Sequence, residues 1–151
     1  MINVSSNLLA SSFFAYFVAT ILAWGSFASK QKKASLKIKK WERISIIVAA
    51  LGFLLQIGYF ITRWIAISHV PVSNMFEFTT FLGMMIVLGY LIIYLIYKTN
   101  IIGLFALPTA MTVIAYASVF PKEATPLVPA LQSYWLKIHV TTAALGEGIL
   151  T

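Results

Sequence analysis

Residues Met75–Tyr97, MFEFTTFLGMMIVLGYLIIYLIY, decide the fold class of this chain. They form a run of 23 residues in which Glu77 is the one charged side chain. About 20 apolar residues in a helix are enough to cross the hydrocarbon core of a bilayer. Lipid offers no partners for backbone N–H and C=O groups, so such a span must be a helix rather than an open strand. The run therefore predicts a transmembrane α-helix.

Three further apolar runs of similar length lie at Leu8–Ala28, Ile44–Ile67 and Ile101–Phe120. Hydrophobic residues make up 60% of the chain and charged residues 10%, whereas soluble domains are about half apolar. The sequence therefore predicts an all-α, polytopic integral membrane protein with four complete transmembrane helices.

A fifth apolar segment begins near Ile138 and reaches the last residue, Thr151. Fourteen helical residues span only about 21 Å, which is too short to cross a bilayer. We therefore expect residues 1–151 to be the N-terminal part of a larger membrane domain, cut within its fifth helix.

Basic residues are concentrated in one connection. Seven of the eleven Lys and Arg residues lie between Lys30 and Arg43, between two apolar runs. The positive-inside rule predicts that this connection is cytoplasmic, and it explains the charge without nucleic acid as a partner. The N-terminus is then outside, as are the turn at residues 69–74 and the segment at residues 121–137.

Cysteine is absent from the chain. Disulfides, thiol redox chemistry, cysteine metal sites and covalent c-type haem attachment are therefore excluded for these residues.

The segment TPLVPALQSYWLKIHV, Thr125–Val140, holds the first candidate site. Trp135 and His139 are four residues apart and share one helix face. A neutral imidazole ligates haem iron, and an adjacent tryptophan can pack on a porphyrin. The alternatives are an interfacial histidine with ordinary hydrogen bonds and a tryptophan of the interfacial aromatic belt.

His69 lies in the other outer segment, so both histidines of the chain are expected on the same side of the membrane. They would form a bis-histidine site or be two unrelated loop residues. Asn74 and Glu77 are spaced like a helix N-cap and its partner three residues later. Arg63 lies within the second span, where a charge is costly. It would reach the headgroups, pair with Glu77 or hold a haem propionate, in that order of preference.

Glu147 shares a helix stripe with His139 and is expected to face protein or water rather than lipid.

Three stretches carry a resemblance to a known family. HVPVSNMFEF from His69 is similar to an outer-loop motif of the form HFPLSNLYES, LPTA at Leu107 is similar to an APSA-type helix segment, and the stretch from Thr125 is the most specific match. Over residues 60–150 the chain resembles the CcsA/ResC-type membrane component of system II cytochrome c biogenesis.

The resemblance implies binding of b-type haem, non-covalently and in transit, at the outer face of the cytoplasmic membrane of a bacterium. It places His139 at the first external haem ligand, with Trp135 and His69 as further motif residues. It also implies a CcsB/ResB-type partner subunit, apocytochrome c as acceptor and membrane lipid as surroundings. The complete protein would belong to a synthetase-type haem-attachment complex.

The chain departs from the family because it ends before a tryptophan-rich signature of the form WGxxWxWD and before the second external histidine. We therefore expect these residues alone to be inactive in haem attachment. Two other functions remain open: a non-catalytic assembly subunit of a membrane complex, and part of a small-solute transporter. A transporter would be expected to have polar or broken helices near mid-membrane.

Overall fold

The computed structural model describes residues 2–30, 36–121 and 133–151. All regular structure in these ranges is helical, which confirms the all-α class. The five helices are α1 (Ile2–Lys30), α2 (Leu36–Ile67), α3 (Met75–Tyr97), α4 (Gly103–Ala117) and α5 (Tyr134–Leu150).

Three of these helices, α1, α2 and α3, are long and apolar enough to cross a membrane. Large apolar side chains on every helix point outward instead of into a core. A soluble protein does not expose apolar surface on this scale, but lipid favours it. Examples that are more than half exposed include Phe14, Leu54, Ile65, Leu95, Ile96, Phe105 and Leu150. The chain is a multi-pass membrane protein.

Helix α4 is shorter than the sequence predicts. The expected span was Ile101–Phe120, but the helix covers only Gly103–Ala117, and turns occupy the residues on either side. Its 15 residues rise about 22 Å. Pro121 gives one reason for the early end, because the residue before a proline is disfavoured in helical conformation. Helix α5, in contrast, begins at Tyr134, four residues before the expected start.

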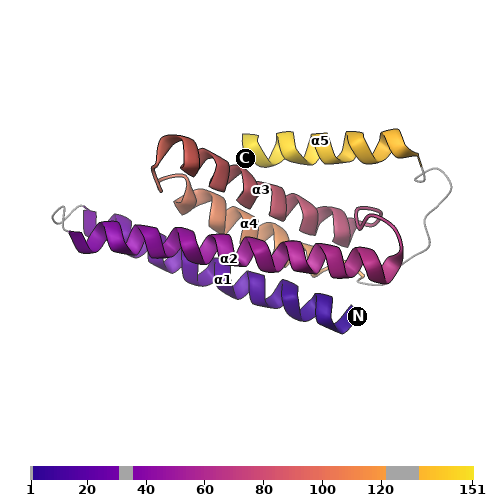
Figure 1. Cartoon of the computed structure of the whole chain (residues 1–151), viewed down its shortest axis with the longest axis horizontal. Helices are drawn as coiled ribbons and strands as arrows, with labels where there is room; N and C mark the ends of the chain where they lie inside the picture. Colours follow the sequence, from indigo (N-terminus) through magenta and orange to yellow (C-terminus); the bar gives the residue numbers. More distant parts are fainter. Residues whose placement is uncertain (1, 31–35, 122–132) are drawn as a thin grey trace.

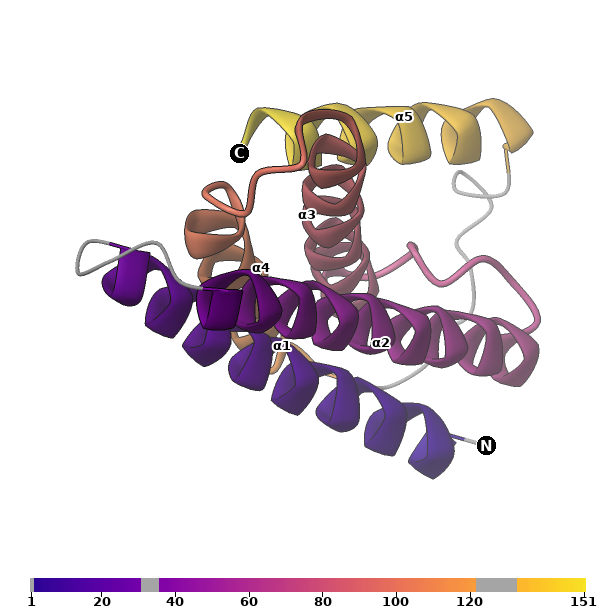
Figure 2. The same ribbon diagram turned by 60° about the vertical axis from the view of Figure 1, so that its left-hand side comes forward.

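The helices form a bundle in which α3 is central. Helix α1 packs along α2 and also contacts α4, while α3 packs against α2, α4 and α5. Figure 2 shows α5 lying on α3, on the side of the bundle away from α1. The α3–α5 contact is close because of two glycines. A Cβ on Gly148 would lie 2.8 Å from the backbone carbon of Met85, and one on Gly89 would lie 3.2 Å from the Gly148 oxygen.

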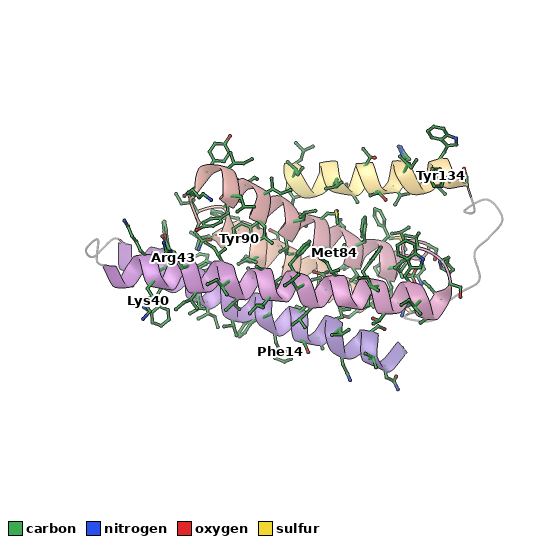
Figure 3. All side chains as sticks on the ribbon, viewed as in Figure 1. Phe14, Lys40, Arg43, Met84, Tyr90 and Tyr134 are labelled. Carbon is green, nitrogen blue, oxygen red and sulfur yellow. The ribbon has the colours of Figure 1, made fainter. Side chains whose placement is uncertain are left out.

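The two ends of the bundle carry different connections. The N-terminus, the α2–α3 connection and the start of α5 lie at one end, whereas the α3–α4 turn and the start of α2 lie at the other (Figure 1). Figure 3 shows Lys40 and Arg43 at the end opposite Tyr134. This arrangement agrees with the expected topology, in which the basic connection is cytoplasmic and both histidine-bearing segments are outside. The end with Tyr134 is therefore referred to as the outer end.

Candidate functional site

A buried ion pair ties the end of α2 to the start of α3. Nε of Arg63 lies 3.1 Å from Oε1 of Glu77, and each residue is only 2% exposed. The Arg63 guanidinium also stacks over the Phe76 ring, 5.3 Å from its centroid. The first-ranked expectation for Arg63, that it reaches outward to the headgroups, is therefore wrong. The carboxylate and the aromatic ring hold the charge inside, which is the usual arrangement for a charge within a span.

The start of α3 is capped as the sequence predicts. Oδ1 of Asn74 accepts a 2.8 Å hydrogen bond from the backbone N–H of Glu77. The second carboxylate oxygen of Glu77 accepts bonds from the N–H of Ser73 at 3.2 Å and from its hydroxyl at 2.9 Å. Glu77 thus bonds Arg63 of α2 and Ser73, near the end of the connection between α2 and α3, at once. The contribution of Ser73 had no specific sequence signal, because serine is an ordinary loop residue.

His69 lies in this outer loop, residues 68–74. Its imidazole is half-buried, and Nδ1 lies 3.1 Å from the carbonyl oxygen of Val70. Ser68, directly before it, adopts a left-handed backbone with φ of 60° and donates its N–H to the Trp64 carbonyl at the end of α2. The loop therefore turns sharply at Ser68 and carries His69 away from the helix.

Trp135 and His139 lie on one exposed face of α5, in its first two turns. Trp135 is 78% exposed, and His139 is also exposed. No hydrogen bond joins the His139 side chain to another residue in the part of the chain that the structure describes. Both side chains are thus placed to contact something beyond the bundle, as a haem ligand and its stacking partner would be. The rest of the motif, from Thr125 to Gln132, lies outside the described residues, as does the side chain of Lys137.

An apolar groove of about 540 Å³ lies between α5 and the outer ends of α2 and α3. Ligand pockets in proteins commonly have volumes of about 300–1,000 Å³. The groove brings together α2, α3, α5 and the outer loop through Phe60, Trp64, Val70, Phe81, Tyr134, Ile138, Thr141 and Thr142. Sequence reasoning missed the groove, because its aromatic walls come from segments far apart in the chain.

The groove is lined by neighbours of both histidines. Val70 follows His69 directly, and Ile138 precedes His139 directly. The structure therefore places both histidine-bearing segments at one groove, although no contact joins the two imidazoles. Among residues 2–30, 36–121 and 133–151, no three His, Cys, Asp or Glu side chains gather as a metal site. A haem, which takes one or two axial side chains, does not need such a cluster.

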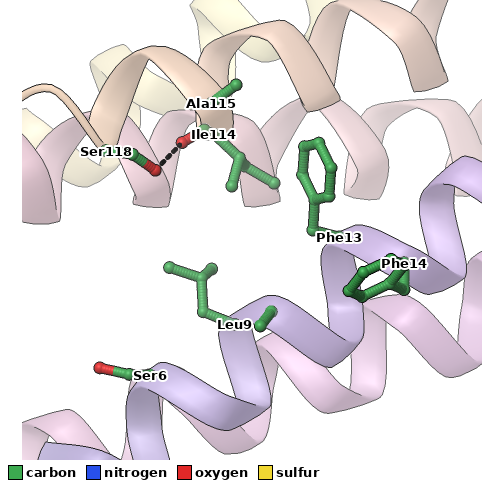
Figure 4. A pocket seen from close by; sticks show the side chains of 8 residues that line it. Ser6, Leu9, Phe13, Phe14, Ile114, Ala115 and Ser118 are labelled. Atoms are coloured by element: carbon green, nitrogen blue, oxygen red, sulfur yellow. Dashed lines mark hydrogen bonds between the residues drawn. The ribbon is translucent and has the colours of Figure 1, made fainter.

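A second cavity, of about 380 Å³, lies between α1 and α4 (Figure 4). Its walls are mainly apolar, and Figure 4 shows Leu9 and Phe13 of α1 facing Ile114 of α4. The Ser118 hydroxyl at its edge bonds weakly to the Ile114 carbonyl, at 3.5 Å. None of the predicted site residues lines this cavity.

Glu147 is exposed on α5. His139 is also exposed on this helix, and the shared stripe of the two residues stays a prediction.

Curated relatives match almost the whole chain. The cytochrome c biogenesis protein CcsA of Gloeobacter violaceus is 31% identical over 144 residues, which are 93% of this chain and 41% of the relative. The CcsA proteins of Marchantia polymorpha and of Synechococcus sp. (strain CC9605) are 31% and 35% identical, each over 99% of the chain, and the match covers 46% and 49% of their own lengths.

The chain thus spans less than half the length of these relatives. No family model matches it, and no solved structure matches it. Its matches to CcsA proteins nevertheless extend over 98–99% of its residues. Over almost its whole length the chain is therefore homologous to the CcsA cytochrome c biogenesis proteins.

Proposed function

We propose that the protein binds haem at the outer end of its helix bundle and delivers it for attachment to apocytochrome c, with His139 as an axial ligand. The observation that carries this proposal is the exposed His139 imidazole on a CcsA-type helix, with Trp135 one turn away on the same face. Imidazole is a common ligand for haem iron.

The chemistry of the outer end fits a haem group. His139 supplies the nitrogen ligand, and Trp135 supplies a flat apolar face for the porphyrin. The neighbouring groove is lined mainly by apolar and aromatic side chains and accepts an apolar ring edge. Bound haem would be b-type and non-covalent, and it supplies the porphyrin that becomes attached to the apocytochrome.

The roles of the other predicted residues follow from their positions. His69 directly precedes Val70 of the groove wall and is proposed as a second polar contact to the haem. The Arg63 guanidinium already pairs with Glu77. Its contact with a haem propionate therefore stays a prediction. We further propose a CcsB/ResB-type partner subunit and location in the cytoplasmic membrane of a bacterium.

Substitution of His139 tests the function in cells that depend on this protein for their c-type cytochromes. His139→Ala should lower the amount of c-type cytochrome by at least about tenfold, as expected for loss of a metal contact. Thr112→Ala is the control, because Thr112 is exposed on α4 and does not line the groove. Normal cytochrome levels in His139→Ala cells would contradict the ligand assignment and favour the non-catalytic assembly role.

A further inference from the structure

The outer loop is closed by one carboxylate. Glu77 binds Arg63 of α2 through Oε1 and Ser73 of the loop through Oε2, while its backbone N–H bonds Asn74. The chain between Arg63 and Glu77 contains the end of α2 and the whole loop. These four residues, referred to here as the clasp, therefore fix both ends of the loop relative to each other.

The charged groups of the clasp are buried, and burial decides whether the pair stabilises the fold or mainly defines the position of the loop. Arg63 and Glu77 are each 2% exposed, so both charges are removed from water and from the headgroups. A buried ion pair is seldom more stabilising than a well-packed apolar pair of similar size, because desolvation offsets the attraction. Its directional bonds, however, permit few alternative arrangements of the groups that it joins. The pair is thus better suited to defining the position of the loop than to raising stability.

The loop faces α5 across the groove. Val70 shares the groove walls with Tyr134 and Ile138, and His69 is the neighbour of Val70. Helix α5 itself is docked on α3 through Gly148 and Gly89. The position of His69 relative to α5 therefore depends on two separate attachments: the glycine contact for α5 and the clasp for the loop.

We propose that the Arg63–Glu77 pair is a positioning element that holds the outer loop, and with it His69, against α5 at the groove beside His139. This inference rests on the proposed function for its consequence in haem binding, but its geometric part is testable without haem. Arg63 and Glu77 act here through the loop and not by touching the iron.

Cysteine crosslinking tests the geometry, because the chain contains no cysteine of its own. Val70→Cys and Ile138→Cys would be introduced together, and a short bismaleimide would join the two thiols across the groove. The parent pair should crosslink efficiently in membranes. The key variant adds Arg63→Met and Glu77→Met, which replace both charges by apolar side chains and so leave no unpaired buried charge.

We expect the doubly substituted variant to keep its helical circular dichroism but to crosslink severalfold less. Arg43→Met, which removes a basic residue at the opposite end of α2, should leave crosslinking unchanged. Unchanged crosslinking in a folded Arg63→Met/Glu77→Met variant would overturn the inference.

Haem titration of the same proteins separates this inference from the proposed function. If the Arg63→Met/Glu77→Met variant both binds haem more weakly and crosslinks less, the result supports the positioning of the loop and the proposed function. A second outcome is that crosslinking falls in the Arg63→Met/Glu77→Met variant but haem affinity is the same in the wild type and in His139→Ala. That outcome would contradict the proposed function and still support the positioning of the loop.

Discussion

The hydroxyl of Tyr16 on α1 donates a 2.6 Å hydrogen bond to Oε1 of Gln56 on α2, and both side chains are fully buried. The Gln56 amide in turn donates to the carbonyl of Thr80 on α3 at 3.1 Å. One polar bridge thus joins three helices inside an apolar bundle. Gly52 makes room for it, since a Cβ there would lie 2.8 Å from the Tyr16 ring.

Tyr16→Phe should destabilise the bundle by about 1 kcal/mol, the size of a typical hydrogen bond between membrane helices. The loss arises because Oε1 of Gln56 is left without its donor. The measurement is the unfolding free energy of the protein in detergent. Tyr97→Phe is the control, because Tyr97 is 70% exposed and should be neutral. Equal stability of the two variants would show that the bridge contributes nothing.

Two glycines of α5 should respond differently to the same substitution. Gly148→Ala places a methyl group 2.8 Å from the Met85 backbone carbon, so α5 must move away from α3. We expect the free energy of unfolding to fall by about 1–3 kcal/mol, as for other overpacked contacts. Hydrogen exchange in α5 would report its weaker docking.

Gly146→Ala is the matched control for this change, since a Cβ at Gly146 meets nothing within 4 Å. It should be neutral or stabilise the helix by up to about 1 kcal/mol, the difference in helix propensity. Similar hydrogen exchange in the two alanine variants would contradict the close α3–α5 contact.

Replacing one partner of the Arg63–Glu77 pair should lower the free energy of unfolding more than replacing both. Arg63→Met leaves the buried Glu77 carboxylate uncompensated, at an expected cost of about 3–5 kcal/mol. Arg63→Met/Glu77→Met should recover much of that loss, because no buried charge remains. A double-mutant cycle on the unfolding free energy measures the coupling. Additive losses would mean that the two charges do not interact.

The sidedness of the bundle is testable with single cysteines and a membrane-impermeant maleimide. Tyr134→Cys should react from outside in intact cells, because its side chain is 73% exposed at the outer end. Lys40→Cys, at the opposite end, should react only after the membrane is opened. The reverse pattern would contradict the predicted topology.

Local features of the fold were predictable from the sequence, whereas contacts between distant segments were not. The apolar run Met75–Tyr97 coincides with α3, and the Asn74 cap was evident from its spacing to Glu77. Both depend on neighbouring residues along one helix. The end of α4 was misplaced, because the apolar run continues to Phe120, whereas the helix already ends at Ala117, four residues before Pro121.

The candidate site was predicted in part. Trp135 and His139 share an exposed face of one helix, as their spacing indicates. The groove, in contrast, depends on how α5 docks on α3, and the burial of Arg63 depends on where Phe76 and Glu77 lie in space. No sequence spacing encodes these tertiary distances.

Haem titration of the protein in lipid nanodiscs, followed by Soret absorbance, tests the central claim most directly. The account predicts a red-shifted, saturable Soret band for the wild-type protein. In His139→Ala the affinity should fall by at least about tenfold, while Thr112→Ala, on α4 and away from the groove, should bind as the wild type does. Identical spectra and affinities for the wild type and His139→Ala would contradict the assignment of His139 as the haem ligand.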